Sequence, residues 1–209
     1  MSELKVKSTT ENEVVLPDKI VREFGTKLSG RLVRRTDGDY DEQRAVWNGM
    51  IDKEPALIAR CTAADDVAEA VNFARRHDLL VAVRGGGHNV AGTAVCDGGL
   101  VIDLAPMTNV AVDPDARTAR AQGGATIADL DAATQAHGLA TPMGVVSETG
   151  IAGLTLGGGI GWLRRKYGLS CDNLVSAQVV TADGRTLRAS QTENADLFWG
   201  IRGGGGNFG

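Results

Sequence analysis

Apolar positions recur at strand-like and helix-like spacing through the middle of the 209-residue chain. Residues 56–60 form a short apolar run, which is typical of a buried strand, and Thr62 is expected to cap the helix that follows. One face of that helix carries Val67, Ala70, Val71 and Ala74. A second apolar run at residues 79–83 completes the pattern, so a βαβ unit is predicted over residues 55–84.

The pattern changes after residue 100. Strand-like runs at residues 100–104 and 118–122 flank a turn signal at residues 113–115, and their alternation suggests antiparallel pairing. Thr126 is expected to cap an amphipathic helix that ends at Gly138, with this glycine in the C-cap position.

The last third of the chain predicts one more hairpin and one more helix. The hairpin pairs residues 174–181 with residues 185–189 through Ala182-Asp183-Gly184, and a short helix lies near residues 196–201.

These elements predict an α+β fold of two subdomains. A lead-in segment with a helix at residues 1–50 precedes a βαβ subdomain at about 51–105 and a mainly antiparallel subdomain at 106–209. A ligand is expected in the cleft between the two subdomains.

Glycine is the compositional anomaly, because 28 of 209 residues are glycine and most of the excess follows position 84. The run Arg84-Gly85-Gly86-Gly87-His88-Asn89 leaves the second strand of the βαβ unit and then presents one imidazole. Consecutive glycines allow backbone amides to turn inward and bind a pyrophosphate. A flexible turn with an exposed histidine is the alternative.

The sequence lacks a P-loop motif, and it has no Rossmann motif between a strand and a helix. Neither the loop at Gly85 nor that at Gly157 has the Rossmann spacing between a strand and a helix. The run Gly204-x-Gly206-x-x-Gly209 has the spacing but follows a predicted helix, so we treat it as a false positive. No G-x-x-x-x-G-K-[ST] motif occurs, which disfavours a P-loop nucleotide hydrolase.

Composition and charge limit the classes of molecule that the chain is expected to bind. With 43% hydrophobic residues, 23% charged residues and a net charge of -4, the chain is predicted to be globular, to bind a small ligand, and to bind neither nucleic acid nor an anionic membrane. Residues 1–20 lack an apolar segment, so a cytoplasmic location is expected. Cys61, Cys96 and Cys171 are odd in number and far apart, which favours reduced thiols and no metal site.

Several separated motifs resemble one known family. They are Val83-Arg-Gly-Gly-Gly-His-Asn89, Gly99-Leu-Val-Ile-Asp-Leu104, the stretch from Gly150 to Leu174, and the terminal DLFWGIRGGGGNFG. In this order they resemble the PCMH-type FAD-binding domain of the berberine bridge enzyme-like flavoproteins, in the vanillyl-alcohol oxidase superfamily. The resemblance covers residues 31–209.

The resemblance implies a cofactor and its attachment. FAD would be the cofactor, with its pyrophosphate on the loop from Arg84 to Asn89 and His88 bonded covalently to the 8α-methyl group of the flavin. A histidine that packs beside FAD without a bond is the alternative. Many relatives carry a second bond from a cysteine, but Val146 stands at that position here, so a single attachment is expected. Thr149 lies nearest the family's oxygen-access position and favours an oxidase.

The resemblance also implies two stretches of cofactor-binding residues. The first stretch consists of Arg84, Gly85, Gly86, Gly87, His88, Asn89 and Gly92. The second consists of Pro142, Gly144, Thr149, Gly150, Gly153, Leu156, Gly157, Gly158, Gly159, Gly161, Tyr167, Asp172, Asn173 and Val179.

Structural explanations stay open for part of this set. Gly157, Gly158, Gly159 and Gly161 would serve either close approach to the flavin or tight packing. Tyr167 and Trp162 would border the flavin or pack in the core, and Asp172-Asn173 would contact the cofactor or form a turn. The basic run 164–166 is a phosphate patch or a solvated surface.

The function implied is that of an FAD-dependent oxidoreductase. Hydride would pass from a C–H bond of an alcohol, sugar, amine or alkaloid-like small molecule to the flavin, and electrons then to oxygen. Family members continue past the point that matches residue 209 with a substrate domain and the catalytic base, so the base is expected outside this chain, which looks like a fragment. The alternative is a non-catalytic FAD-binding or assembly module.

Overall fold

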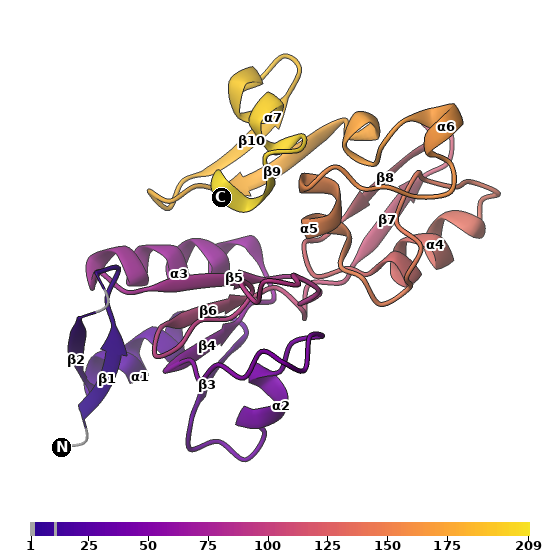
Figure 1. Cartoon of the computed structure of the whole chain (residues 1–209). Coiled ribbons are helices and arrows are strands. Elements are labelled where there is room, and N and C mark those ends of the chain that lie inside the picture. Colours follow the sequence, from indigo (N-terminus) through magenta and orange to yellow (C-terminus); the bar gives the residue numbers. More distant parts are fainter. Residues whose placement is uncertain (1–2, 11) are drawn as a thin grey trace. The chain divides into compact units, whose positions relative to one another are not determined.

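The computed structural model describes residues 3–10 and 12–209 and divides the chain into two compact units (Figure 1). The first unit extends to Pro106 and includes Ala182–Arg185. The second unit consists of Met107–Thr181 and Thr186–Gly209. Both units mix helices with strands, as the sequence predicted.

A four-stranded sheet with the order β3-β4-β6-β5 forms the centre of the first unit. Its strands are β3 (Arg31–Arg34), β4 (Leu57–Arg60), β5 (Val81–Arg84) and β6 (Leu100–Asp103). Strand β3 is antiparallel to β4, whereas β4 and β5 both run parallel to β6. The antiparallel pairing suggested for residues 100–104 is therefore wrong. Strand β6 lies between the two strands of the predicted βαβ unit and is buried along its length, as central parallel strands are.

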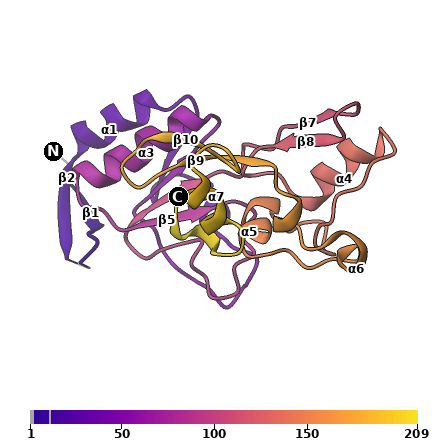
Figure 2. The same cartoon turned by 90° about the horizontal axis from the view of Figure 1, so that it is seen from above.

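Helix α3 (Ala64–Arg76) connects β4 to β5 and packs beside α1 (Asp18–Lys27), as Figure 2 shows. The rings of Phe24 and Phe73 stack between the two helices with centroids 4.0 Å apart. Ala63, not Thr62, is the N-cap residue of α3. The capping prediction fails because the Thr62 N–H and hydroxyl both donate to the Asp66 carboxylate within the helix.

Asp66 is a buried acid that ties this helix to the chain before β3. Its carboxylate also accepts hydrogen bonds from the backbone N–H groups of Ser29 and Gly30. Burial acts to raise the pKa of Asp66, but the hydrogen bonds from Thr62, Ser29 and Gly30 outweigh it and the pKa is lowered.

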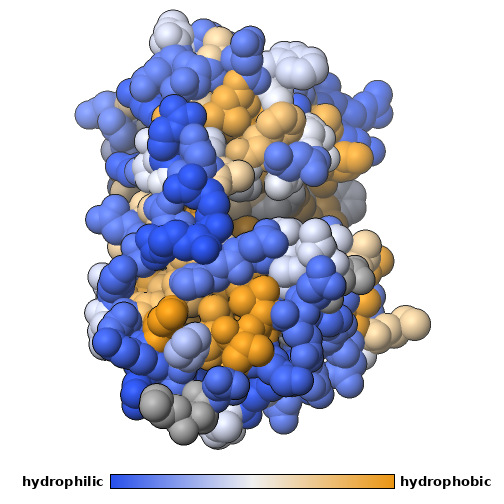
Figure 3. All heavy atoms as spheres, turned by 90° about the vertical axis from the view of Figure 1, so that its left-hand side faces the viewer, coloured by the Kyte–Doolittle hydropathy of each residue, from blue (hydrophilic) through white to orange (hydrophobic). Residues whose placement is uncertain are grey.

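The lead-in segment holds more structure than one helix. Strands β1 (Glu3–Lys7) and β2 (Glu13–Pro17) form an antiparallel hairpin before α1. Helix α2 (Tyr40–Arg44) lies between β3 and β4. Hydrophilic residues cover most of the face that carries this hairpin, with hydrophobic surface between them (Figure 3).

The second unit begins with a hairpin and the predicted capped helix. Strands β7 (Val110–Asp113) and β8 (Thr118–Ala121) pair antiparallel, and α4 (Ile127–Gln135) follows. Thr126 forms the predicted cap as a full capping box with Asp129. Helix α4 ends before the predicted position, and Gly138 closes the next turn with φ of 65°. Helix α5 (Ile151–Leu156) packs on α4, with Ala125, Ile127, Leu130 and Ile151 at the core.

The remainder of the second unit forms a smaller core. Its elements are α6 (Arg164–Tyr167), η1 (Cys171–Asn173), β9 (Ser176–Val180), β10 (Thr186–Ser190), α7 (Ala195–Ile201) and η2 (Gly205–Asn207). Strands β9 and β10 form the predicted hairpin, and Ala189 of β10 forms a buried cluster with Phe198 and Ile201 of α7. The antiparallel strands of this unit thus form two separate two-stranded sheets.

None of the helices in residues 3–10 and 12–209 combines the length and the apolar character that a membrane span requires. The same residues contain no group of three or more histidines, cysteines or acids arranged to hold a metal ion.

Candidate flavin site

Arg84 anchors the glycine-rich loop of the first unit. Its guanidinium is buried and pairs with the fully buried Asp103 on the neighbouring strand, with Nε 3.0 Å from Oδ1 and Nη2 2.8 Å from Oδ2. Arg60 Nε lies 3.3 Å from the same carboxylate. The third guanidinium nitrogen, Nη1, donates to the Ala45 carbonyl at 3.0 Å. Arg84, predicted as a cofactor residue, thus holds the end of β5 through two hydrogen bonds and an ion pair.

The backbone of the following loop carries a row of free donors. Within the described part of the chain, the N–H groups of Gly85, Gly86, Gly87 and His88 donate no hydrogen bond. Gly87 has a φ of 71°, in the left-handed region that favours glycine. Unpaired amides in consecutive positions are the feature that an anion-binding loop requires, so the predicted pyrophosphate cradle fits this backbone.

Asn89 and Gly92 end the loop with a tight turn. The Gly92 N–H donates to the Asn89 carbonyl at 3.0 Å, and the Asn89 side chain accepts from the Thr93 N–H at 3.2 Å. Gly92 has a φ of 71°, and a Cβ there would lie 2.8 Å from Ile51. Both residues shape the loop through local contacts.

His88 is half-buried and its imidazole stacks on an indole that the sequence prediction did not include. The ring centroids of His88 and Trp47 lie 5.2 Å apart with an interplanar angle of 21°. The Trp47 N–H donates to the Gly87 carbonyl at 3.2 Å, and Asn48 Nδ2 donates to the Val90 carbonyl at 3.0 Å. Residues 47 and 48 thus hold the loop on both sides of His88. No local sequence pattern marks this contact, because about forty residues separate its partners.

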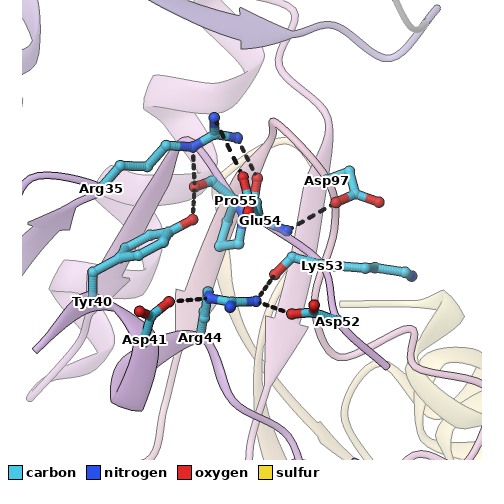
Figure 4. Close-up of polar contacts among 9 residues, drawn as sticks. All are labelled: Arg35, Tyr40, Asp41, Arg44, Asp52, Lys53, Glu54, Pro55 and Asp97. Carbon is cyan, nitrogen blue, oxygen red and sulfur yellow. Dashed lines mark hydrogen bonds and ion pairs between the residues drawn. The ribbon is translucent and has the colours of Figure 1, made fainter. Parts of the chain in front are cut away.

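A polar network fixes the chain on either side of Trp47 (Figure 4). Arg44 forms ion pairs with Asp41 and Asp52 and donates to the Lys53 carbonyl. Near the end of this network, the Tyr40 hydroxyl donates to the Pro55 carbonyl at 2.7 Å. Lys53 Nζ in turn donates to the carbonyls of Gly92 and Val95, beyond the glycine loop. The segment 45–53, hereafter the strap, is therefore attached along the glycine loop from Arg84 to Val95.

In the second unit, the stretch from Pro142 to Gly150 forms an open loop before α5. Pro142 and Gly150 are buried at its two ends, and Thr149 accepts from the Ile127 N–H through its carbonyl at 3.0 Å. Gly144 packs on Leu154 of α5. Within the described residues, the N–H groups from Gly144 to Glu148 donate no hydrogen bond. Val146 is exposed in this loop, and its side chain cannot form a thioether.

The second glycine run, from Gly157 to Gly161, lies beside that loop. Gly158 and Gly159 have φ values of 113° and 79°, which require glycine. Close packing also uses two of these residues, because a Cβ at Gly161 would overlap the Met143 carbonyl and one at Gly159 would overlap Ser170. The N–H groups of residues 159–162 donate no hydrogen bond within the described part of the chain. Both explanations for these glycines therefore have support, at different positions.

Four other predicted residues of this unit have structural roles of their own. Asp172 accepts from the Leu169 N–H at 2.8 Å, and Asn173 Nδ2 donates to the carbonyls of Tyr167 and Leu169, so this pair forms a turn. Val179 and Leu156 pack against the small core of Ala189, Phe198 and Ile201.

Gly153 and the aromatic residues face solvent. A Cβ at Gly153 would have no neighbour within 4 Å. Tyr167 and Trp162 are exposed, so core packing, one of the two explanations considered for them, is wrong. The basic run 164–166 is exposed with them.

Comparison with known proteins identifies the class. A family model described as "FAD binding domain" matches residues 55–190, which is more than half of the chain. The match includes the loop at Gly85, the loop at Val146 and the second glycine run. The α+β fold and the predicted cofactor, FAD, are confirmed by this match.

Individual relatives agree with the family. The chain is 41% identical over 182 residues to (R)-6-hydroxynicotine oxidase of Paenarthrobacter nicotinovorans, covering 87% of this chain and 40% of that protein. Among solved structures, BBE-like 1 of Physcomitrella patens matches with a TM-score of 0.85 and 30% identity over 90% of this chain and 42% of that one. A chitooligosaccharide oxidase matches with a TM-score of 0.81 and 33% identity, covering 88% of this chain and 40% of that one.

The chain is an FAD-binding domain by fold and by sequence. It belongs to the PCMH-type FAD-binding domains of the berberine bridge enzyme-like flavoproteins. It spans about two-fifths of the length of these relatives.

Proposed function

We propose that this chain is the cofactor domain of an FAD-linked oxidoreductase in which His88 is the single covalent attachment point of the flavin. The observation that carries the proposal is the loop after β5. It combines four consecutive backbone amides that have no partner among the described residues with a half-buried imidazole at the end of the row. When bound, FAD supplies an isoalloxazine ring that accepts a hydride from a substrate C–H bond and returns the electrons to oxygen.

The amides of residues 85–88 would hold the pyrophosphate, and glycine at position 87 would allow the positive φ that this curvature needs. The open amides of residues 144–148 and 159–162 would lie against other parts of the cofactor in the same way. All of these donors are backbone N–H groups, which suit a ligand rich in phosphate and carbonyl oxygens.

A nitrogen of His88 would form the covalent bond to the 8α carbon. That bond would replace one hydrogen of the methyl group and the N–H hydrogen of the imidazole, so two protons and two electrons would leave. Dioxygen would take them and become hydrogen peroxide, which balances the step. Val146 stands in the loop where a cysteinyl link would require a thiol, so His88 would act alone.

The substrate of the whole protein would be a small molecule with an oxidisable C–H bond beside an amine nitrogen or a hydroxyl oxygen. The relatives named as a 6-hydroxynicotine oxidase and a chitooligosaccharide oxidase support this class, and they favour oxygen as the acceptor. The catalytic base would lie in the part of these relatives that the chain does not span. We also propose a cytoplasmic location, which the three free cysteines support.

Acid precipitation of the purified chain tests the attachment. The proposal predicts a yellow pellet for the wild type, and for His88→Ala a colourless pellet with the flavin in the supernatant. His137→Ala is the matched control, because His137 is an exposed histidine of the second unit outside the predicted site, and its pellet should stay yellow. Flavin in the supernatant of the wild type would refute the covalent bond, and a colourless protein would refute FAD binding by this chain.

A further inference from the structure

We propose that Trp47 is a positioning residue that orients the His88 imidazole for its bond to FAD. The inference rests on the proposed covalent attachment and adds the residue that prepares the attacking group. Trp47 belongs to the lead-in segment, outside the part of the chain that the family model matches.

The stacking geometry leaves the reactive edge of the imidazole free. The indole lies nearly parallel to the imidazole, at 21°, with the centroids 5.2 Å apart. The lone pair that forms the new bond lies in the plane of the imidazole, so a ring stacked on the face does not cover it. In the described part of the chain, neither ring nitrogen of His88 has a hydrogen-bond or ion-pair partner. The contact therefore restrains the ring without occupying its nucleophile.

The indole can restrain the imidazole because its own backbone is fixed to the same loop. The backbone N–H of Trp47 donates to the carbonyl of Gly87, the residue before His88. The side chain of the next residue, Asn48, donates to the carbonyl of Val90. Arg84 donates to the carbonyl of Ala45 at 3.0 Å. Three hydrogen bonds thus connect the strap to the loop at positions just before and just after the histidine.

The strap is also held at its ends, so this alignment does not depend on the stack. Arg44 closes the strap through Asp41, Asp52 and the Lys53 carbonyl (Figure 4), and Lys53 reaches past the glycine loop. Removal of the indole should leave the strap in place.

The exposure of the Trp47 side chain allows a positioning role to be distinguished from a role in folding. Trp47 is 64% exposed, so its side chain buries little apolar surface beyond the contact with His88. Truncation should therefore change the orientation of the imidazole more than it changes the stability of the fold. Met50, on the same strap and 90% exposed, provides a matched control.

The test measures the rate of covalent attachment in the full chain. Flavin-free protein is mixed with FAD, and acid-precipitable flavin is followed with time. Trp47→Ala is expected to slow attachment about two- to twelvefold, the range that the energy of one aromatic pair corresponds to. Trp47→Phe should restore most of the rate, because a phenyl ring can stack, and Met50→Ala should match the wild type.

A second measurement distinguishes orientation from cofactor affinity. In the His88→Ala background, Trp47→Ala should change the Kd for FAD less than twofold, and circular dichroism melts of the variants should coincide. Attachment by Trp47→Ala at the wild-type rate would overturn the proposal, as would a Phe variant as slow as the Ala variant. Attachment in His88→Ala, or none in the wild type, would overturn the proposed function itself and this inference with it.

Discussion

Removal of the Asp103 carboxylate should destabilise the first unit strongly. Asp103 is fully buried at the end of β6 and is the counter-charge of two guanidinium groups, those of Arg84 and Arg60. It also accepts the Ala105 N–H at 3.1 Å. Because the Arg84 side chain is only 8% exposed, Asp103→Ala leaves a buried cation without its partner.

The magnitude follows from these contacts. Breaking a buried pair by removing one partner costs about 3–5 kcal/mol, and the unmet Ala105 N–H adds about 1 kcal/mol. The total, about 4–6 kcal/mol, is a large fraction of the ~5–15 kcal/mol that typically stabilises a domain. Replacement of the pair by Asp103→Leu with Arg84→Met should cost less, about 2–3 kcal/mol, since no buried charge remains at Arg84. The losses are the hydrogen bonds at the Ala45 carbonyl and the Ala105 N–H and the contact with the part-exposed Arg60.

Urea unfolding followed by tryptophan fluorescence measures these changes. Trp162 and Trp199 belong to the second unit, so a Trp162→Phe/Trp199→Phe background leaves Trp47 as the reporter of the first unit. The slope of the free energy of unfolding against urea concentration should be the same for all variants, and only the urea concentration at the midpoint of unfolding should change. A loss below about 1 kcal/mol for Asp103→Ala, or a double variant as unstable as the single one, would refute the reasoning.

Three further outcomes are expected. Thr126→Ala removes the capping box of α4 and should cost about 1 kcal/mol, seen as faster hydrogen exchange in that helix; unchanged exchange would contradict it. Gly161→Ala would place a Cβ on the Met143 carbonyl and should lower the midpoint of thermal unfolding. Gly153→Ala, at an open helix position, should raise the free energy of unfolding by about 0.5–1 kcal/mol. Equal midpoints for the two variants would contradict the packing argument. Burial raises the pKa of Cys96 from 9.0 to about 11. The contribution of this neutral thiol to the free energy of unfolding is therefore fully present below pH 9 and is lost as the pH rises through about 11. Alkylation of Cys96 at pH 8 should be much slower in the native protein than in urea.

Periodicity located most elements of the fold but not their partners. The apolar runs at residues 56–60 and 79–83 correspond to β4 and β5 within two residues, and the Thr126 cap was found where predicted. The parallel insertion of β6 between β4 and β5 was missed, because a four-residue buried strand looks the same in either direction. The strands and helices of residues 3–44 were mostly missed too, since the polar, short runs there gave only a helix.

The site shows the same division between local and long-range information. The glycine run and its histidine were visible in the sequence, because unusual backbone requires glycine and that requirement is local. Ion pairing of Arg84 with Asp103 and stacking of His88 on Trp47 join residues 19 and about forty positions apart. The turn-forming contacts of Asp172 and Asn173 were open from sequence alone, and the hydrogen bonds to Leu169 and Tyr167 show them to be turn-forming.

Peptide mapping of the flavin tests the central proposal most directly. Trypsin cleaves after Arg84 and next after Arg117, so one peptide, residues 85–117, contains the glycine loop and His88. The account predicts that this peptide alone carries the flavin, with a mass increase equal to FAD less two hydrogen atoms and with fragment ions that place it on His88. Flavin on any other peptide, or an unmodified 85–117 peptide from yellow protein, would contradict it.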